Sequence, residues 1–213
     1  LTLSMLPPPA AGLRQGLLVN GSFYEDKTQE AWETVCRIAD PTVRYLSIQA
    51  APQVQIGKGF ASYYWKSLRN RAKSWRARFL ARTTELGATI ERKQIKLLRW
   101  KYCEPTAVGF LARLANSEGV VSGRFHCVTL CLLTETPFFA IGSNTHKIEA
   151  LLEACRLEGR VYSGYSEALA ERCRIAFSAE ELQSIREFVR GSRAQAQQMF
   201  ADIAAHAALA HGH

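Results

Sequence analysis

No stretch of the sequence approaches the roughly 20 consecutive apolar residues that a membrane-spanning helix needs. The opening segment, Leu1 to Pro9, is too short for a signal-peptide core and has no positively charged start. We therefore expect neither a transmembrane helix nor a signal peptide in these residues.

The cysteines form no CxxC pair and show no Cys/His spacing typical of metal ligands. The six are scattered along the chain, and only Cys127 and Cys131 lie one helical turn apart. Two thiols without a partner pair are a weak indication of zinc, whereas reduced cysteines in apolar helices behave as small hydrophobic residues. We expect reduced thiols in a cytosolic compartment and no metal site.

Acidic residues are absent from Pro41 to Thr84, in a chain whose 27 Lys+Arg against 19 Asp+Glu give a formal net charge of +8. An apolar stripe at helical spacing runs through this stretch, and its residues are Trp65, Leu68, Ala72, Trp75 and Phe79. Stacking on nucleic acid bases requires exposed aromatic side chains. A stripe in the core is the better interpretation, and we expect no nucleic acid partner.

The basic residues of the same stretch occupy the other faces of the expected helix. A basic amphipathic helix suits an anionic membrane surface or a diphosphate-bearing lipid. The residues expected to make this contact are Lys66, Arg69, Lys73 and Arg76. A charged face that is exposed only to water is the simpler alternative.

The overall composition is that of a globular protein. The 213 residues are 47% hydrophobic and 22% charged, which excludes an intrinsically disordered chain. Prolines at 7–9 followed by Ala-Ala-Gly are typical of a stiff linker, so we expect a linker over 1–15 that connects to residues preceding Leu1. A single domain is expected over 16–177, with a C-terminal helix and tail over 178–213.

Short apolar segments alternate with amphipathic segments along the expected domain. Strands are expected over 16–20, 43–48, 89–95, 119–122, 137–141 and 161–162, and helices over 28–39, 62–86, 104–117, 126–133 and 145–155. This alternation predicts an α/β fold of the Rossmann-like kind, with a parallel sheet covered by helices on both faces. Ser178 and Glu181 form a capping-box pattern that opens a long helix extending to about Ala208.

Two strand-to-helix junctions carry unusual polar residues. Ser122-Gly-Arg-Phe-His126 follows the strand over 119–122, and Gly142-Ser-Asn-Thr-His-Lys147 follows the strand over 137–141. Cations are disfavoured at the positive end of a helix dipole, so Arg124 and Lys147 suggest that an anion binds at these helix N-termini. In the alternative, Arg124 pairs with a carboxylate such as Glu149 and Lys147 points into water.

These residues resemble a known family, the polysaccharide pyruvyl transferases, in its C-terminal half. The resemblance rests on Ser122-x-Arg124-x-His126, the Thr136-Pro-Phe138 segment, Asn144-x-x-Lys147-Ile148 and Leu151-Leu152. It is good over 120–157 and only topological over 16–119. It implies the domain arrangement of GT-B glycosyltransferases, in which the active site lies between two Rossmann-like domains.

The resemblance also implies the roles of individual residues. Ser122, Arg124, Asn144 and Lys147 would bind the donor, phosphoenolpyruvate, and His126 would act as a general acid or as a donor to the phosphate. No separate cofactor is implied. The acceptor, a sugar of a cell-surface polysaccharide or its lipid-linked precursor, would be bound largely by an N-terminal domain that this chain lacks, in the cytoplasm or at the inner face of the membrane.

Two other functions fit the same residues. A GT-B glycosyltransferase would use the cations to hold the diphosphate of a nucleotide-sugar, with Glu149 or Glu153 as weakly placed candidates to bind the ribose. A non-catalytic binding module would retain the fold alone.

Overall fold

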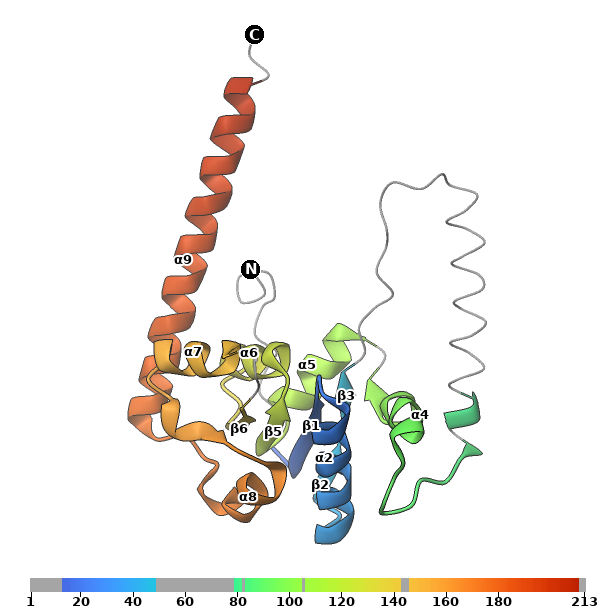
Figure 1. The fold of residues 1–213 in the computed structure, drawn as a ribbon. Helices are drawn as coiled ribbons and strands as arrows, with labels where there is room; N and C mark the ends of the chain where they lie inside the picture. The colour runs from blue at the N-terminus through green and yellow to red at the C-terminus, as the bar shows by residue number, and fades with distance from the viewer. Residues whose placement is uncertain (1–12, 49–78, 82, 105, 143–145, 211–213) are drawn as a thin grey trace, which may run out of the picture.

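A computed structural model of the chain describes residues 13–48, 79–81, 83–104, 106–142 and 146–210. Its centre is a five-stranded sheet in the order β2-β1-β5-β6-β7 (Figure 1). The strands are β1 (Leu17–Ser22), β2 (Val43–Tyr45), β5 (Gly119–Gly123), β6 (Phe138–Ile141) and β7 (Val161–Tyr162). Each neighbouring pair is parallel, which confirms the expected α/β fold with a parallel sheet.

Helices cover both faces of this sheet (Figure 1). One face carries α5 (Ala107–Ala115), α6 (Phe125–Leu133) and α7 (Lys147–Ala154), and the other carries α2 (Glu25–Ile38) and α8 (Tyr165–Ala170). The shorter α4 (Ile95–Lys101) follows the 3₁₀ turn η1 (Arg92–Gln94) and packs against α2 and a two-stranded sheet. That second sheet pairs β3 (Ser47–Ile48) with β4 (Cys103–Glu104).

The core has two layers because successive strand residues point to opposite faces. Val120 and Phe138 pack with α5, α6 and α7, whereas their neighbours Val121 and Phe139 pack with α2 and α8. All four side chains are buried. Strands that bury both faces need continuous apolar sequence, which is why β5 and β6 could be recognised without alternation.

The C-terminal part of the chain contains two 3₁₀ turns, η2 (Glu158–Arg160) and η3 (Arg172–Arg174), and the 32-residue helix α9 (Ala179–Ala210). The capping box is present: the Ser178 N–H donates to Glu181 Oε2 at 2.7 Å, and the Glu181 N–H donates to Ser178 Oγ at 3.1 Å. The first turns of α9 pack on the domain through Ile185, and the rest of the helix extends away from the sheet (Figure 1).

Several local expectations were wrong. Residues 89–95 form no strand: 92–94 are η1 and α4 begins at Ile95, because Ile95 and Leu98 share the buried face of a helix. The expected strand 43–48 divides at Leu46: its N–H donates to Val19 of the main sheet, whereas the Ser47 N–H donates to Tyr102 beside the second sheet. Helix α8 was not expected.

Other expectations concern residues outside the described part of the chain. Most of the helix expected over 62–86 lies there, although residues 79–81 and 83 are helical. The expected linker over 1–15 is described only from residue 13. None of the helices within the described ranges is long and apolar enough to cross a bilayer.

All six cysteines carry free thiols. Burial raises the pKa of the Cys155 thiol to about 12 and also raises that of Cys131. These two side chains therefore remain neutral and act as apolar core residues.

Candidate functional site

A buried hydrogen-bond network joins the carboxyl ends of β1 and β5. The Ser122 hydroxyl donates to Asn20 Oδ1 at 3.2 Å, and Asn20 Nδ2 donates to the Leu46 carbonyl at 2.6 Å. The Tyr165 hydroxyl donates to the Asn20 carbonyl at 2.9 Å and accepts from the Gly123 N–H at 3.0 Å. Because each group has a partner, the network fixes the edge at which ligands of parallel α/β sheets bind.

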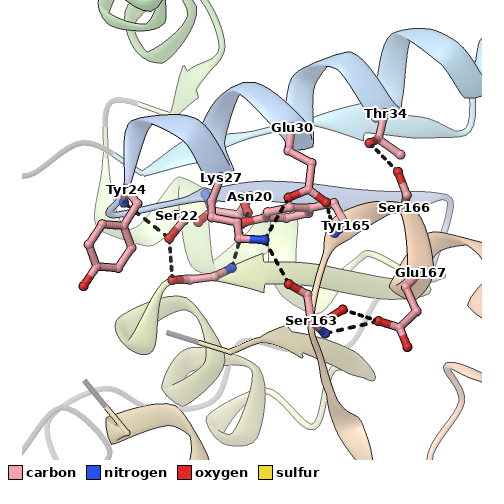
Figure 2. Close-up of polar contacts among 11 residues, drawn as sticks. Asn20, Ser22, Tyr24, Lys27, Glu30, Thr34, Ser163, Tyr165, Ser166 and Glu167 are labelled. Atoms are coloured by element: carbon pink, nitrogen blue, oxygen red, sulfur yellow. Dashed lines mark hydrogen bonds and ion pairs between the residues drawn. The ribbon is translucent and has the colours of Figure 1, made fainter. Parts of the chain in front are cut away.

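Contacts between α2 and α8 hold Tyr165 in this network (Figure 2). Glu30 Oε1 accepts the Tyr165 N–H at 2.7 Å, and Glu30 Oε2 pairs with Lys27 Nζ at 3.2 Å. Lys27 Nζ also donates to the Ser163 carbonyl at 3.0 Å. These contacts hold the start of α8 against the first turns of α2. They thereby keep the Tyr165 hydroxyl in contact with the carboxyl ends of β1 and β5.

Ser122 also sets the turn from β5 into α6. Its Oγ accepts the Arg124 N–H at 3.1 Å, and the side chain is only 1% exposed. The Ser122 hydroxyl donates its hydrogen to Asn20, so both of these hydrogen bonds are inside the protein. Through them it holds the backbone of Arg124 in place. A direct contact between Ser122 and a donor stays a prediction.

Two glycines allow the close approach of the strands at this edge. A Cβ on Gly123 would lie 2.9 Å from both Ser22 Cβ and Tyr165 Oη. A Cβ on Gly21 would lie 2.7 Å from Tyr45 Oη. The β1–β5 pairing shifts register between Asn20 and Ser22, so β1 continues through Gly21 and Ser22, where the sequence had suggested that it stops.

Arg124 is a half-buried cation at the N-cap position of α6. Burial and the nearby Arg99 charge lower the pKa of its guanidinium. Its side chain makes no hydrogen bond or ion pair among the residues that the structure describes, and the alternative pairing with Glu149 is not formed there. A desolvated cation at a helix N-terminus is electrostatically unfavourable by itself and is stabilised when an anion binds.

His126 and Lys147 lie at the same edge of the sheet as Arg124. His126 is exposed in the first turn of α6, and Lys147 is the exposed first residue of α7. Neither is among the groups that shift the pKa of Arg124, and no hydrogen bond joins the three within the described residues. Their convergence on one ligand stays a prediction, and Asn144 lies outside the described residues.

The proposed membrane-contact residues are also outside the described part of the chain. They are Lys66, Arg69, Lys73 and Arg76. Their contact with an anionic surface therefore stays a prediction.

Arg99, on α4, is a residue of this region that the sequence did not point to. Its Nε and Nη2 are buried without a hydrogen-bond partner in the described part of the chain, and its charge acts on both Arg124 and Tyr45. Burial raises the pKa of Tyr45 to about 12, so this phenol is neutral and provides no counter-charge. With residues 89–95 taken as a strand, the sequence could not show which face of α4 Arg99 occupies.

A cavity of about 610 Å³ lies at the opposite edge, by the amino ends of β1 and β2. Its cations already have partners: Arg44 Nε donates to the Pro41 carbonyl at 3.3 Å, and Arg113 Nε pairs with Glu104 at 2.8 Å. None of the described site residues predicted from the sequence lines it. The carboxyl edge, where Arg124 and Arg99 form no ion pair within the described residues, is the better candidate for an anionic ligand.

Comparison with known proteins shows the family to which the chain belongs. The family described as Polysaccharide pyruvyl transferase matches residues 22–145, more than half of the 213-residue chain. This chain belongs to the polysaccharide pyruvyl transferase family. The family match includes Ser122, Arg124 and His126 as well as Arg99, and it ends just before Lys147.

The chain is also similar to a solved structure of a mutant O-GlcNAc transferase from Thermobaculum terrenum. The two share 13% sequence identity with a TM-score of 0.43, and the match covers 89% of this chain and 34% of that one. This chain thus spans about a third of the length of that protein. No curated protein sequence matches the chain.

Proposed function

We propose that this chain forms the donor-binding half of an enzyme that transfers a pyruvyl group from phosphoenolpyruvate to a sugar. The observation that carries the proposal is Arg124, a desolvated guanidinium without an ion pair in the described chain, set between β5 and α6. Phosphoenolpyruvate has a carboxylate and a phosphate, so it suits an edge that presents fixed cations and helix N-termini. Family membership supports the same donor.

In the proposed reaction the donor becomes a cyclic ketal. Protonation of the methylene carbon of phosphoenolpyruvate forms a methyl group and leaves a cationic carbon. One sugar hydroxyl adds to that carbon and loses its proton. The carbon–oxygen bond to phosphate then breaks, phosphate leaves with the electron pair, and a second hydroxyl adds with loss of its proton, so that one inorganic phosphate is released for each ketal.

Four of the predicted residues have direct roles in this reaction. Arg124 holds one anionic group of the donor through its planar pair of N–H donors. Lys147 and Asn144 contact the other group from the β6–α7 connection. His126 protonates the methylene carbon or donates to the departing phosphate, both of which suit an imidazole near neutral pH.

The acceptor is the second part of the proposal. In this proposal the chain supplies the donor side, and a sugar of a cell-surface polysaccharide or of its lipid-linked precursor would be bound largely by a partner domain. The basic stretch between Pro41 and Thr84 supports a location at an anionic membrane surface.

Donor binding is the direct test. Calorimetric titration of the chain with phosphoenolpyruvate should give saturable binding, and Arg124→Ala should weaken it by about 2–4 kcal/mol, which is typical of losing a charged partner in a desolvated site. Arg174→Ala, which removes an exposed guanidinium far along the chain, is the matched control and should leave binding unchanged.

The same titration separates the rival functions. Binding of a nucleoside-diphosphate sugar in preference to phosphoenolpyruvate would replace the proposal with a glycosyltransferase. Binding of neither ligand would leave a module without donor chemistry.

A further inference from the structure

Arg99 contains the only two arginine nitrogens in the described chain that are buried without a hydrogen-bond partner, Nε and Nη2. A guanidinium carries five N–H donors, and each buried donor left unpaired costs stability. Native proteins retain such groups where a ligand, an ion or a water completes them. The unpaired atoms of Arg99 therefore need an explanation beyond packing.

The position of Arg99 is set by the helix that carries it. Ile95 and Leu98 of α4 are completely buried, and α4 packs against α2 and β3. The ring of Tyr102, at the end of α4, lies 5.1 Å from that of Trp32 and 6.1 Å from that of Tyr45. These contacts fix α4 against α2 and β3, and the charge of Arg99 acts on Tyr45 at the carboxyl end of β2.

The Arg99 charge acts on the carboxylate of Glu25, but that carboxylate is already paired with Arg92. The Arg99 charge contributes to the lowered pKa of Glu25, but Glu25 Oε2 accepts from Arg92 Nε at 2.6 Å and this bond is the main cause. Arg99 itself forms no ion pair within the described residues. Its positive charge is therefore not compensated locally by a direct carboxylate contact.

The positive charge of Arg99 acts on Arg124. The Arg99 charge lowers the pKa of Arg124, and both charges act on the hydroxyl of Tyr45. Like charges repel each other, and burial strengthens the repulsion because water screens it less. A small molecule with two negative groups would relieve the repulsion and complete the unpaired donors.

We propose that Arg99 is a second anion-binding residue of the donor site, which together with Arg124 binds the two negative groups of one small dianion. The inference rests on the proposed function for the identity of that dianion, phosphoenolpyruvate. It adds a cation from α4 to a site that the sequence assigned to the β5–α6 and β6–α7 junctions. The donor would then be held between α4 and the N-terminus of α6.

The test measures stability and affinity of the same variants. Arg99→Met should leave the melting temperature of the free chain unchanged or raise it, because the substitution removes an unpaired buried charge. It should also weaken phosphoenolpyruvate binding at least 30-fold. Lys96→Met, which removes an exposed charge from the same helix, is the matched control and should bind within threefold of the parent chain.

The outcomes distinguish this inference from the proposed function. If the parent chain binds phosphoenolpyruvate and Arg99→Met binds it equally well, Arg99 is not a ligand residue and the function stands. A lower melting temperature for Arg99→Met, with affinity retained, would show that the residue has only a structural role. If pyrophosphate binds through Arg99 whereas phosphoenolpyruvate does not bind, the anion site stands and the proposed donor is wrong. Failure of every dianion to bind overturns both.

Discussion

Arg160 and Glu181 form a bidentate ion pair that fastens α9 to the sheet. Arg160 Nε lies 2.6 Å from Glu181 Oε1, and Nη2 lies 2.7 Å from Oε2. The same guanidinium donates to the carbonyls of Phe138, Ile175 and Ala176. Arg160 is only 5% exposed. One buried guanidinium therefore joins β6, the segment before α9, and α9 itself.

Replacing Arg160 with Met should destabilise the chain by about 3–5 kcal/mol, because it leaves three carbonyls and a carboxylate without their common donor. Urea denaturation followed by circular dichroism measures this difference. Arg174→Met removes an exposed arginine whose contact to Glu171 is 3.4 Å, and it should change stability by less than about 0.5 kcal/mol. Equal effects of the two substitutions would contradict the proposed importance of the buried pair.

Tyr45 makes stability sensitive to alkaline pH. Burial raises its pKa from the ordinary 10.0 to about 12, so the folded state favours the neutral phenol. The contribution of Tyr45 to the free energy of unfolding is therefore complete below pH 10. It is lost as the pH rises from 10 towards 12, because in this interval the phenol ionises in the unfolded chain but not in the folded one. The full loss is about 2–3 kcal/mol. Tyr45→Phe should flatten the decline in melting temperature across that interval. An unchanged alkaline profile would show that Tyr45 does not cause the decline.

Gly123 should not tolerate a side chain. The added Cβ of Gly123→Ala would lie 2.9 Å from Ser22 Cβ and from Tyr165 Oη, and both are held by packing, so we expect a loss of about 1–3 kcal/mol. Gly191→Ala is the control, because nothing lies within 4 Å of a Cβ added there and alanine favours a helix by about 1 kcal/mol. Opposite changes in melting temperature are expected, and stabilisation by both substitutions would contradict the close approach of β1 and β5.

His126 is expected to affect turnover more than binding. Because the side chain is exposed on α6, His126→Asn should not disturb folding. In the complete enzyme that the proposed function implies, the loss of a general acid should lower kcat by about 100-fold or more. The affinity for phosphoenolpyruvate should change little, and this difference separates a proton donor from a binding residue. An unaltered kcat would remove His126 from the chemistry.

Strands β5, β6 and β7 and helices α6 and α7 could be predicted because their signals are local. A continuous apolar run such as 137–141 indicates a strand buried on both faces wherever it occurs. The capping box of Ser178 and Glu181 is equally local, and both of its hydrogen bonds are present. The segment 89–95 was misassigned because Ile90 and Ile95 are buried by contacts from remote elements, which local alternation does not reveal.

The sequence by itself determined that cations follow two buried strands, because strand periodicity and helix-start residues place Arg124 and Lys147 without reference to the rest of the chain. Only the tertiary structure decided that the Ser122 hydroxyl is held by Asn20 of a neighbouring strand and that Arg99 acts on Arg124. The physical reason is that hydrogen-bond partners and desolvation depend on which distant segments pack together. In a parallel sheet, β1 pairs with β5 across many intervening residues.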